Sequence, residues 1–347
     1  MNLSATGSSR TLAQALLIAL MLGLLGATAS PTDRLGVRRA AASPADPLAA
    51  PFRRPLDRIV ILGASMSCGF GVRMRATAPD GQPLSMRVNL AELIATASGR
   101  PDLVAADLST QVYFTDPRRI AARTAREALA ARPDLVLALD WIFWNGYGLH
   151  GPAGPARDCT DRLSLLEAAL EQLEPLATSG VPVVLGDFPD MHAAIGGGMI
   201  AASMVPDPAC LAQLNRQLAA WATPYPNVAI LKLSSVVQAT LADRAVVAQG
   251  REWSKATVGT LVQRDRLHPT LAGTMVVLAA SLDQADRLTG GRAGLTVPLD
   301  PQVVRDRLRA RLLAMHATAT VPNNSSDEAG PAAAADRNNA GDLTTPD

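Results

Sequence analysis

The sequence predicts an α/β protein with a parallel sheet. Short apolar runs alternate with helical patterns of about 12–18 residues, which is typical of repeated βαβ units. The runs are apolar throughout, as in strands that are buried on both faces. The chain of 347 residues is 48% hydrophobic, and its formal charge of +1 provides no basic surface for nucleic acid.

The order of these segments gives five strands with helices between them. We expect strands at residues 58–63, 102–107, 134–140, 181–187 and 227–233. We expect helices at residues 85–98, 117–131, 161–180 and 208–222, and a last helix that begins at Pro269, because proline is favourable at a first helical position. Ligands of parallel sheets bind outside the carboxyl ends of the strands, so functional side chains should follow these strands.

The two ends of the chain lie outside the predicted fold, which spans residues 56–315. Residues 1–29 predict an export signal, because one arginine precedes an apolar run that closes on the small-x-small sequence "ATA". An uncleaved membrane anchor is the alternative. Residues 30–55 predict a linker and residues 316–347 a disordered tail. We expect an exported protein, periplasmic or secreted, with no stable membrane span once it is processed.

Export would expose the three cysteines, Cys68, Cys159 and Cys210, to an oxidising compartment, where one disulfide is possible. Cys159 with Cys210 is the expected pair, because Cys68 lies in a tight glycine-rich motif. The cysteine spacings match no zinc site, and we expect no metal.

Two short motifs contain residues suited to nucleophilic catalysis. Ser65 directly follows the first strand in "ILGASMSCGFGV", where its hydroxyl could lie exposed at the edge of the sheet. In "RDRLHPT", Asp265 precedes His268 by three residues. A serine needs a base, and a histidine serves as that base when a carboxylate orients its ring. The alternatives are a serine that only caps a helix and an Asp/His pair of ordinary loop residues.

With both motifs in the order Ser…Asp…His, the chain resembles the SGNH (GDSL-like) hydrolase family over most of residues 56–288. The resemblance implies a flavodoxin-like three-layer α/β/α fold and an esterase that forms an acyl-serine intermediate without a cofactor. It implies that Ser65 is the nucleophile, His268 the general base and acid, and Asp265 the orienting carboxylate. The substrate would be a small-molecule, lipid or glycan ester.

The chain departs from the family pattern at the first two motifs. Ala64 stands where the family has an aspartate outside the triad. The family places an oxyanion-hole glycine after the second strand, but "AADLSTQVYFTD" contains none. The backbone N–H of Leu108, Ser109 or Thr110 could donate there instead.

The third family motif, G-x-N-D, is replaced by "LALDWIFWNGYG". Asp140 occupies the glycine position and Ile142 the asparagine position. The expected oxyanion donors are therefore the Ser65 N–H and the side chain of Asn145, three residues beyond Ile142.

Further residues predict a substrate pocket. Trp141 and Trp144 belong to an aromatic cluster that could form a pocket wall or an apolar lid against the sheet. Asp187 follows the fourth strand and is predicted at the same rim, with His192 nearby. The glycines at 196–198 favour a loop that could cover the site.

Two other functions remain open. The altered oxyanion segments are compatible with a non-catalytic envelope binding protein on the same fold. An O-acyltransferase could use the same triad and pass the acyl group to a sugar.

Overall fold

The computed structural model describes residues 56–148, 158–290 and 299–320. The chain divides into two units, residues 1–45 and 46–347, and every described residue belongs to the second. The predicted export signal, the linker and the tail beyond residue 320 lie outside the described residues.

Five parallel strands form the central sheet, in the order β4-β1-β5-β6-β7. Their bounds are β1 (Arg58–Ile61), β4 (Val104–Asp107), β5 (Leu135–Ala138), β6 (Val183–Gly186) and β7 (Val228–Leu231). All five lie within the segments predicted to be strands. Counted along the chain, the sheet order is 2-1-3-4-5, the flavodoxin-like order, which reverses direction at β1 and β5.

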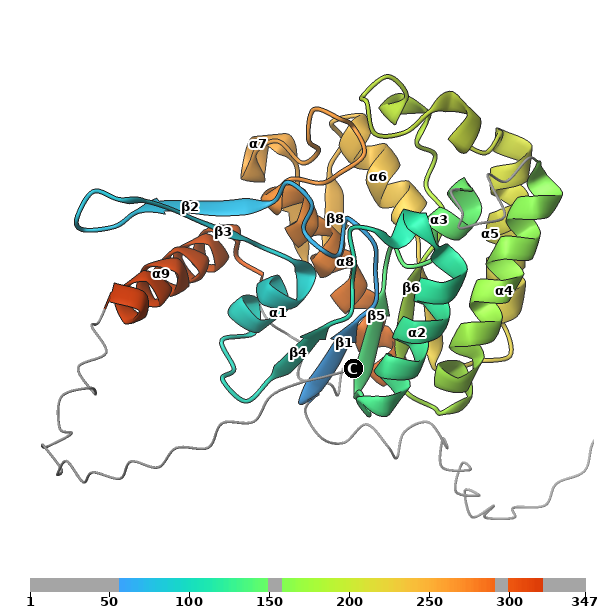
Figure 1. Ribbon diagram of the computed structural model, residues 1–347, viewed down its shortest axis with the longest axis horizontal. Helices are drawn as coiled ribbons and strands as arrows, with labels where there is room; N and C mark the ends of the chain where they lie inside the picture. Colours follow the sequence, from blue (N-terminus) through green and yellow to red (C-terminus); the bar gives the residue numbers. More distant parts are fainter. Residues whose placement is uncertain (1–55, 149–157, 291–298, 321–347) are drawn as a thin grey trace, which may run out of the picture. The chain divides into compact units, whose positions relative to one another are not determined.

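Helices cover both faces of this sheet, so the predicted three-layer α/β/α architecture is confirmed (Figure 1). Side chains of β1 and the residue after it alternate between the layers: Ile59 and Ile61 belong to one core and Val60 and Leu62 to the other. The first core is closed mainly by α1 (Leu90–Ser98) and α8 (Leu271–Thr289). The second is closed by α2 (Pro117–Ala130), α4 (Cys159–Thr178) and α5 (Pro208–Ala222).

The helix predicted at residues 85–98 is wrong in its first part. Residues Pro83–Arg87 form β3, which pairs antiparallel with β2 (Arg73–Thr77). Their side chains alternate between exposed and half-buried, the period of a strand rather than of a helix. Helix α1 begins after Asn89, whose side chain accepts the Glu92 N–H at 2.7 Å.

The last predicted helix begins later than expected. Thr270 caps α8 by accepting the Gly273 N–H at 3.2 Å, so Leu271 is its first residue and Pro269 precedes the helix. The other elements were not predicted. They are α3 (Phe143–Tyr147), α6 (Leu233–Leu241), β8 (Val246–Ala248), β9 (Arg251–Trp253) and α7 (Lys255–Val258), with short 3-10 turns at Tyr113–Thr115, His192–Ala194 and Ala202–Met204.

Helix α9 (Pro301–Thr320) also extends the fold beyond the sequence prediction, because it continues past residue 315. It lies beside the β2–β3 hairpin and contacts α1 (Figure 1). Leu308 is fully buried there, and the Arg307 guanidinium donates to the Ala97 carbonyl near the end of α1 at 2.9 Å. Burial of one face of α9 therefore makes it part of the folded unit.

Cys159 and Cys210 form a disulfide, which confirms the expected pairing. It joins the first turns of α4 and α5, two neighbouring helices of the same layer. Cys68 is buried and free.

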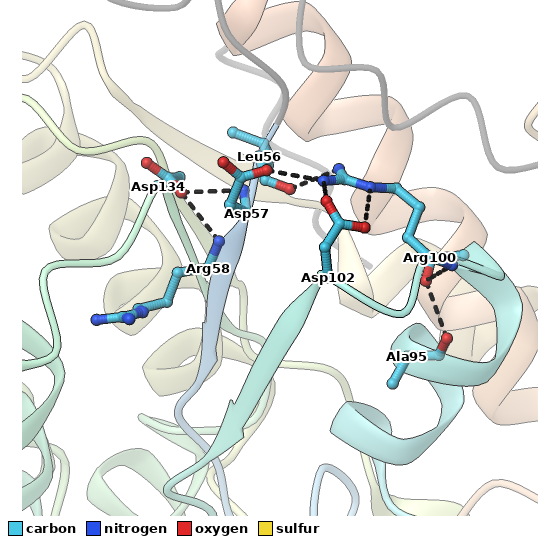
Figure 2. A network of polar contacts seen from close by, with 8 residues as sticks. Leu56, Asp57, Arg58, Ala95, Arg100, Asp102 and Asp134 are labelled. Carbon is cyan, nitrogen blue, oxygen red and sulfur yellow. Dashed lines mark hydrogen bonds and ion pairs between the residues drawn. The ribbon is translucent and has the colours of Figure 1, made fainter.

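Polar contacts anchor the amino end of β1 (Figure 2). Arg100 forms ion pairs with Asp57 and Asp102 and donates to the Leu56 carbonyl at 2.9 Å. An Asp134 oxygen accepts the Asp57 N–H at 3.0 Å and the Arg58 N–H. These contacts fix where the first strand begins.

In the parts of the chain that the structure describes, no helix combines the length and hydropathy needed to cross a membrane.

Replacing Leu308 with alanine should lower the free energy of unfolding by about 3 kcal/mol, because it leaves a cavity between α9 and α1. Urea denaturation of both proteins measures the difference. The exposed neighbour Arg309 provides the control, and Arg309→Ala should change stability by less than about 0.5 kcal/mol. Equal stability of Leu308→Ala and the wild type would show that α9 is not part of the cooperative core.

Candidate active site

Ser65 lies in a series of turns at the carboxyl end of β1. The Phe70 N–H donates to the Ser65 carbonyl at 2.9 Å, and the Cys68 N–H donates to the Ala64 carbonyl at 3.0 Å. No helix begins here, so a helix dipole does not contribute at this serine. The Ser65 side chain is half-buried and remains accessible at the edge of the sheet.

His268 and Asp265 meet Ser65 at this edge. The Ser65 Oγ lies 2.9 Å from His268 Nε2, and His268 Nδ1 lies 2.7 Å from Asp265 Oδ2. A carboxylate only accepts hydrogen bonds, so Nδ1–H donates to it and Nε2 is left to accept the serine proton. The structure therefore brings together the three residues that the sequence predicted, in a geometry suited to proton transfer.

A tight turn places Asp265 under the imidazole. Its Oδ1 accepts the N–H of Leu267 at 3.0 Å and of His268 at 3.1 Å. Arg266 adopts a left-handed φ of 56°, which lets the chain reverse between Asp265 and His268. Burial acts to raise the pKa of Asp265, but hydrogen bonds from the His268 ring and the two N–H groups outweigh it and hold that pKa below its usual value.

Gln263 connects the histidine segment to the serine segment. Its Nε2 donates to the carbonyls of Phe70 and Pro269, both at 2.7 Å. The Phe70 ring lies against the imidazole, with centroids 4.4 Å apart. Gly71 has a left-handed φ of 70°, and a Cβ there would come within 2.4 Å of Gln263 Oε1, so the contact depends on this glycine. Neither Gln263 nor Phe70 could be predicted from the sequence, because their role depends on contacts between distant segments.

The backbone N–H groups named as alternative oxyanion donors are already bonded within the protein. The N–H groups of Leu108, Ser109 and Thr110 all have acceptors within the protein: the carbonyl of Ile61, the carboxylate of Asp107 and the carbonyl of Gly63. In the described ranges the N–H groups of Ser65 and Gln111 have no acceptor. Gln111 was not among the predicted site residues; it directly follows Thr110, whose N–H is bonded to the Gly63 carbonyl.

The predicted contribution of Asn145 is not supported. Asn145 is fully buried in α3, and its side-chain amide donates to the Leu165 carbonyl on α4 at 3.4 Å. Its side chain serves the contact between α3 and α4, and we no longer assign it to the oxyanion hole.

The two tryptophans predicted to line a pocket are core residues. Trp141 is fully buried, and its Nε1 donates to Thr124 on α2 at 2.9 Å. Trp144 is buried between the rings of Phe114 and Phe143. Both side chains belong to the second hydrophobic core and are not exposed to form a pocket wall.

Asp187 is also not exposed to a substrate. Its two oxygens accept the Ser234 N–H at 2.7 Å and the Ser234 hydroxyl at 2.8 Å, which caps the start of α6. Burial raises its pKa. His192 is exposed and contacts Asp190 at 2.6 Å. Within the described ranges, no three His, Cys, Asp or Glu side chains cluster to hold a metal ion.

The glycine loop at 196–198 closely approaches the turn that contains Asp265. A Cβ on Gly197 would lie 2.6 Å from the Asp265 carbonyl oxygen. This close approach lets the loop support the turn that holds Asp265.

A small apolar cavity of about 40 Å³ begins beside the reacting groups. His268 and Met66, the residue after Ser65, form part of its wall. Aliphatic side chains of α6, α8 and the histidine segment complete it, among them Val236, Val277 and Leu261.

Several solved structures are similar to this chain. They include a variant of an acetyl xylan esterase from Geobacillus stearothermophilus, with 17% identity over 69% of this chain and 97% of that one and a TM-score of 0.41. An alpha/beta hydrolase from the metagenome of Lake Arreo has 16% identity over 69% of this chain and 97% of that one, with a TM-score of 0.41. A member of the lipolytic G-D-S-L family from Veillonella parvula has 14% identity over 65% of this chain and 96% of that one, with a TM-score of 0.39. No protein-family profile and no curated protein sequence matches the chain.

The lowered pKa of Asp265 predicts how the stability of the wild type depends on pH. A carboxyl whose pKa is lower in the folded than in the unfolded state stabilises fully above the unfolded value, about 3.9, and this contribution is lost as the pH falls through the folded value. The wild type should therefore exceed Asp265→Asn in unfolding free energy by more at about pH 6 than at about pH 3. Urea denaturation at both pH values tests this, and an equal difference at the two would contradict it.

Proposed function

We propose that this protein is a serine esterase of the SGNH type, which hydrolyses an acyl ester through an acyl-serine intermediate. The observation that carries the proposal is the continuous chain of hydrogen bonds from Ser65 Oγ through the His268 ring to Asp265. A buried imidazole between a hydroxyl and a carboxylate is suited to activate that hydroxyl as a nucleophile.

In the acylation step, the Ser65 oxygen attacks the ester carbonyl carbon while its proton passes to His268 Nε2. The tetrahedral intermediate then collapses, the bond to the alcohol oxygen breaks, and His268 gives its proton to the leaving alcohol. Water repeats the sequence on the acyl-serine: its oxygen bonds to the acyl carbon, its proton passes through His268 to Ser65, and the carboxylic acid leaves. Asp265 remains ionised and stabilises the imidazolium in each half.

The negative charge of the intermediate needs donors aimed at the carbonyl oxygen. We assign this role to the N–H groups of Ser65 and Gln111, which have no acceptor among the described residues. The bond from the Thr110 N–H to the Gly63 carbonyl, at 3.0 Å, holds the Gln111 segment against the serine turn. A backbone pair of this kind supports catalysis without the asparagine of the family pattern.

The apolar cavity beside His268 favours a short acyl group. A single water molecule needs about 10–15 Å³ of such a cavity, so a cavity of about 40 Å³ accepts only a few non-hydrogen atoms. We therefore favour acetyl and other short-chain esters among the small-molecule, lipid and glycan esters that such an enzyme could use.

We further propose that the protein is exported to the periplasm or secreted. The sequence pattern of residues 1–29 supports this location. The disulfide between Cys159 and Cys210 supports it independently, because disulfides persist mainly in oxidising compartments.

A fluorophosphonate probe should label the wild type, because the probe reacts with an activated serine. Ser65→Ala should abolish the label, whereas Ser67→Ala should retain it, since the Ser67 hydroxyl is only 1% exposed. Intact-protein mass spectrometry measures both results. A wild type that is not labelled would favour the non-catalytic binding protein. Labelling together with acyl transfer to an added sugar, instead of acid release, would identify an acyltransferase.

A series of p-nitrophenyl esters tests the size of the acyl pocket. We expect kcat/KM to fall at least about tenfold between butyrate and octanoate, because the longer chain exceeds the cavity. Val236→Ala shortens a side chain of the cavity wall, which enlarges the cavity and should shift the substrate preference toward longer acyl chains. Hydrolysis of octanoate as fast as acetate would show that the acyl group binds elsewhere.

A further inference from the structure

We propose that Asp140 is a positioning residue, whose carboxylate holds the turn on both sides of Ser65 so that the serine hydroxyl and N–H point at the substrate. The inference rests on the proposed esterase function, which does not assign a role to this residue. Asp140 follows β5, at the position where the resembled family has a glycine, and is 6% exposed.

Both carboxylate oxygens of Asp140 contact the serine turn. Oδ1 accepts the Ala64 N–H at 3.1 Å and the Ser67 hydroxyl at 2.6 Å. Oδ2 accepts the Met66 N–H at 2.8 Å and the Ser67 N–H at 3.3 Å. The residues before and after Ser65 are thus bound to one side chain, while the Ser65 N–H itself is left without an acceptor among the described residues.

These contacts favour an ionised carboxylate. The three backbone partners are N–H donors, and the Ser67 hydroxyl can donate as well. An ionised carboxylate can accept on both oxygens, so it satisfies all four donors. Burial raises the pKa of Asp140, and the hydrogen bonds from Ser67, Ala64 and Met66 act in the opposite direction. An ionised group in such a site costs stability, which argues for a role at the reacting centre rather than in the core.

The backbone around Gly63 is shaped for this contact. A Cβ at position 63 would come within 2.5 Å of Asp140 Oδ1 and within 2.3 Å of the Ser67 side chain. The glycine therefore lets the carboxylate lie directly under the turn. The Gly63 carbonyl also accepts the Thr110 N–H, so segments after β4 and β5 fix the serine turn from two sides.

The arrangement also distinguishes the two serines of the motif. The Ser67 hydroxyl is buried and bonded to Asp140, whereas the Ser65 hydroxyl contacts His268. The Asp140 carboxylate thereby holds the Ser67 hydroxyl inside the protein, while the Ser65 hydroxyl remains at His268.

The test is Asp140→Asn, which keeps the shape of the side chain but turns one acceptor into an N–H donor that faces two donors of the turn. We expect kcat for p-nitrophenyl acetate to fall at least about 100-fold, the size of effect seen when one oxyanion donor is lost, with KM changed less than about threefold. Amide hydrogen exchange in the peptide that covers residues 63–70 should become at least about tenfold faster.

Asp283→Asn is the matched control. Asp283 is a half-buried carboxylate on α8 that accepts the Gln249 N–H at 3.0 Å and the Gln249 side-chain amide at 2.7 Å. Its variant should lose stability without changing kcat or exchange at residues 63–70. A kcat loss of the same size in both variants would make the effect of Asp140 one of general stability and overturn the inference.

Asp140→Asn with wild-type kcat and wild-type exchange at residues 63–70 would also overturn the inference.

If Asp140→Asn does not fold, Ser67→Ala provides a second test, because it removes only the 2.6 Å hydrogen bond to Asp140. A kcat reduced about fivefold or more at unchanged KM then supports the inference, and an unchanged kcat overturns it.

A wild type inert to esters and to the fluorophosphonate would contradict the proposed function alone. Faster exchange in Asp140→Asn would then still support the hold on the turn, and unchanged exchange would overturn it.

Discussion

Ser65 and His268 are 203 residues apart in the chain, and the 2.9 Å between Oγ and Nε2 depends on the order of the strands. The sheet reverses its winding at β1, so the segments after β4 and β5 leave on either side of the serine. The histidine segment reaches the same edge because α8 begins there and runs back across the sheet. Gln263, bonded to Phe70 and Pro269, then fixes the remaining separation between the two segments.

The parts of the fold that could be predicted are those with local signals. Buried parallel strands leave continuous apolar runs, and the Asp265–His268 spacing lies within one turn of the chain. Contacts between distant residues leave no such signal. The bond between Asp140 and Ser67 spans 73 residues, and that of Asn145 to Leu165 depends on how two helices pack. Residue type alone therefore predicted a pocket for Trp141 and Asp187, which are buried and bonded to α2 and α6.

The two carboxylates of the site have opposite electrostatic environments. Asp265 receives hydrogen bonds from the imidazole and two N–H groups, and its pKa is lowered despite burial. Asp140 is more deeply buried, and burial prevails over its hydrogen bonds, so its pKa is raised. In the proposed reaction, Asp265 is thus suited to stabilise the charge that would form on His268. Asp140 accepts hydrogen bonds from the residues before and after Ser65 and is suited to hold their backbone N–H groups in place.

A turn that presents a nucleophile must be fixed by something, because its own backbone bonds leave several N–H groups without partners. Ala64 has no side chain that could accept them, and no helix follows to order them. Asp140 supplies the acceptors from the neighbouring strand, and Gly63 provides the room. The turn at the end of β1 therefore requires acceptors in the right places for its N–H groups. A carboxylate from a different part of the chain can supply them.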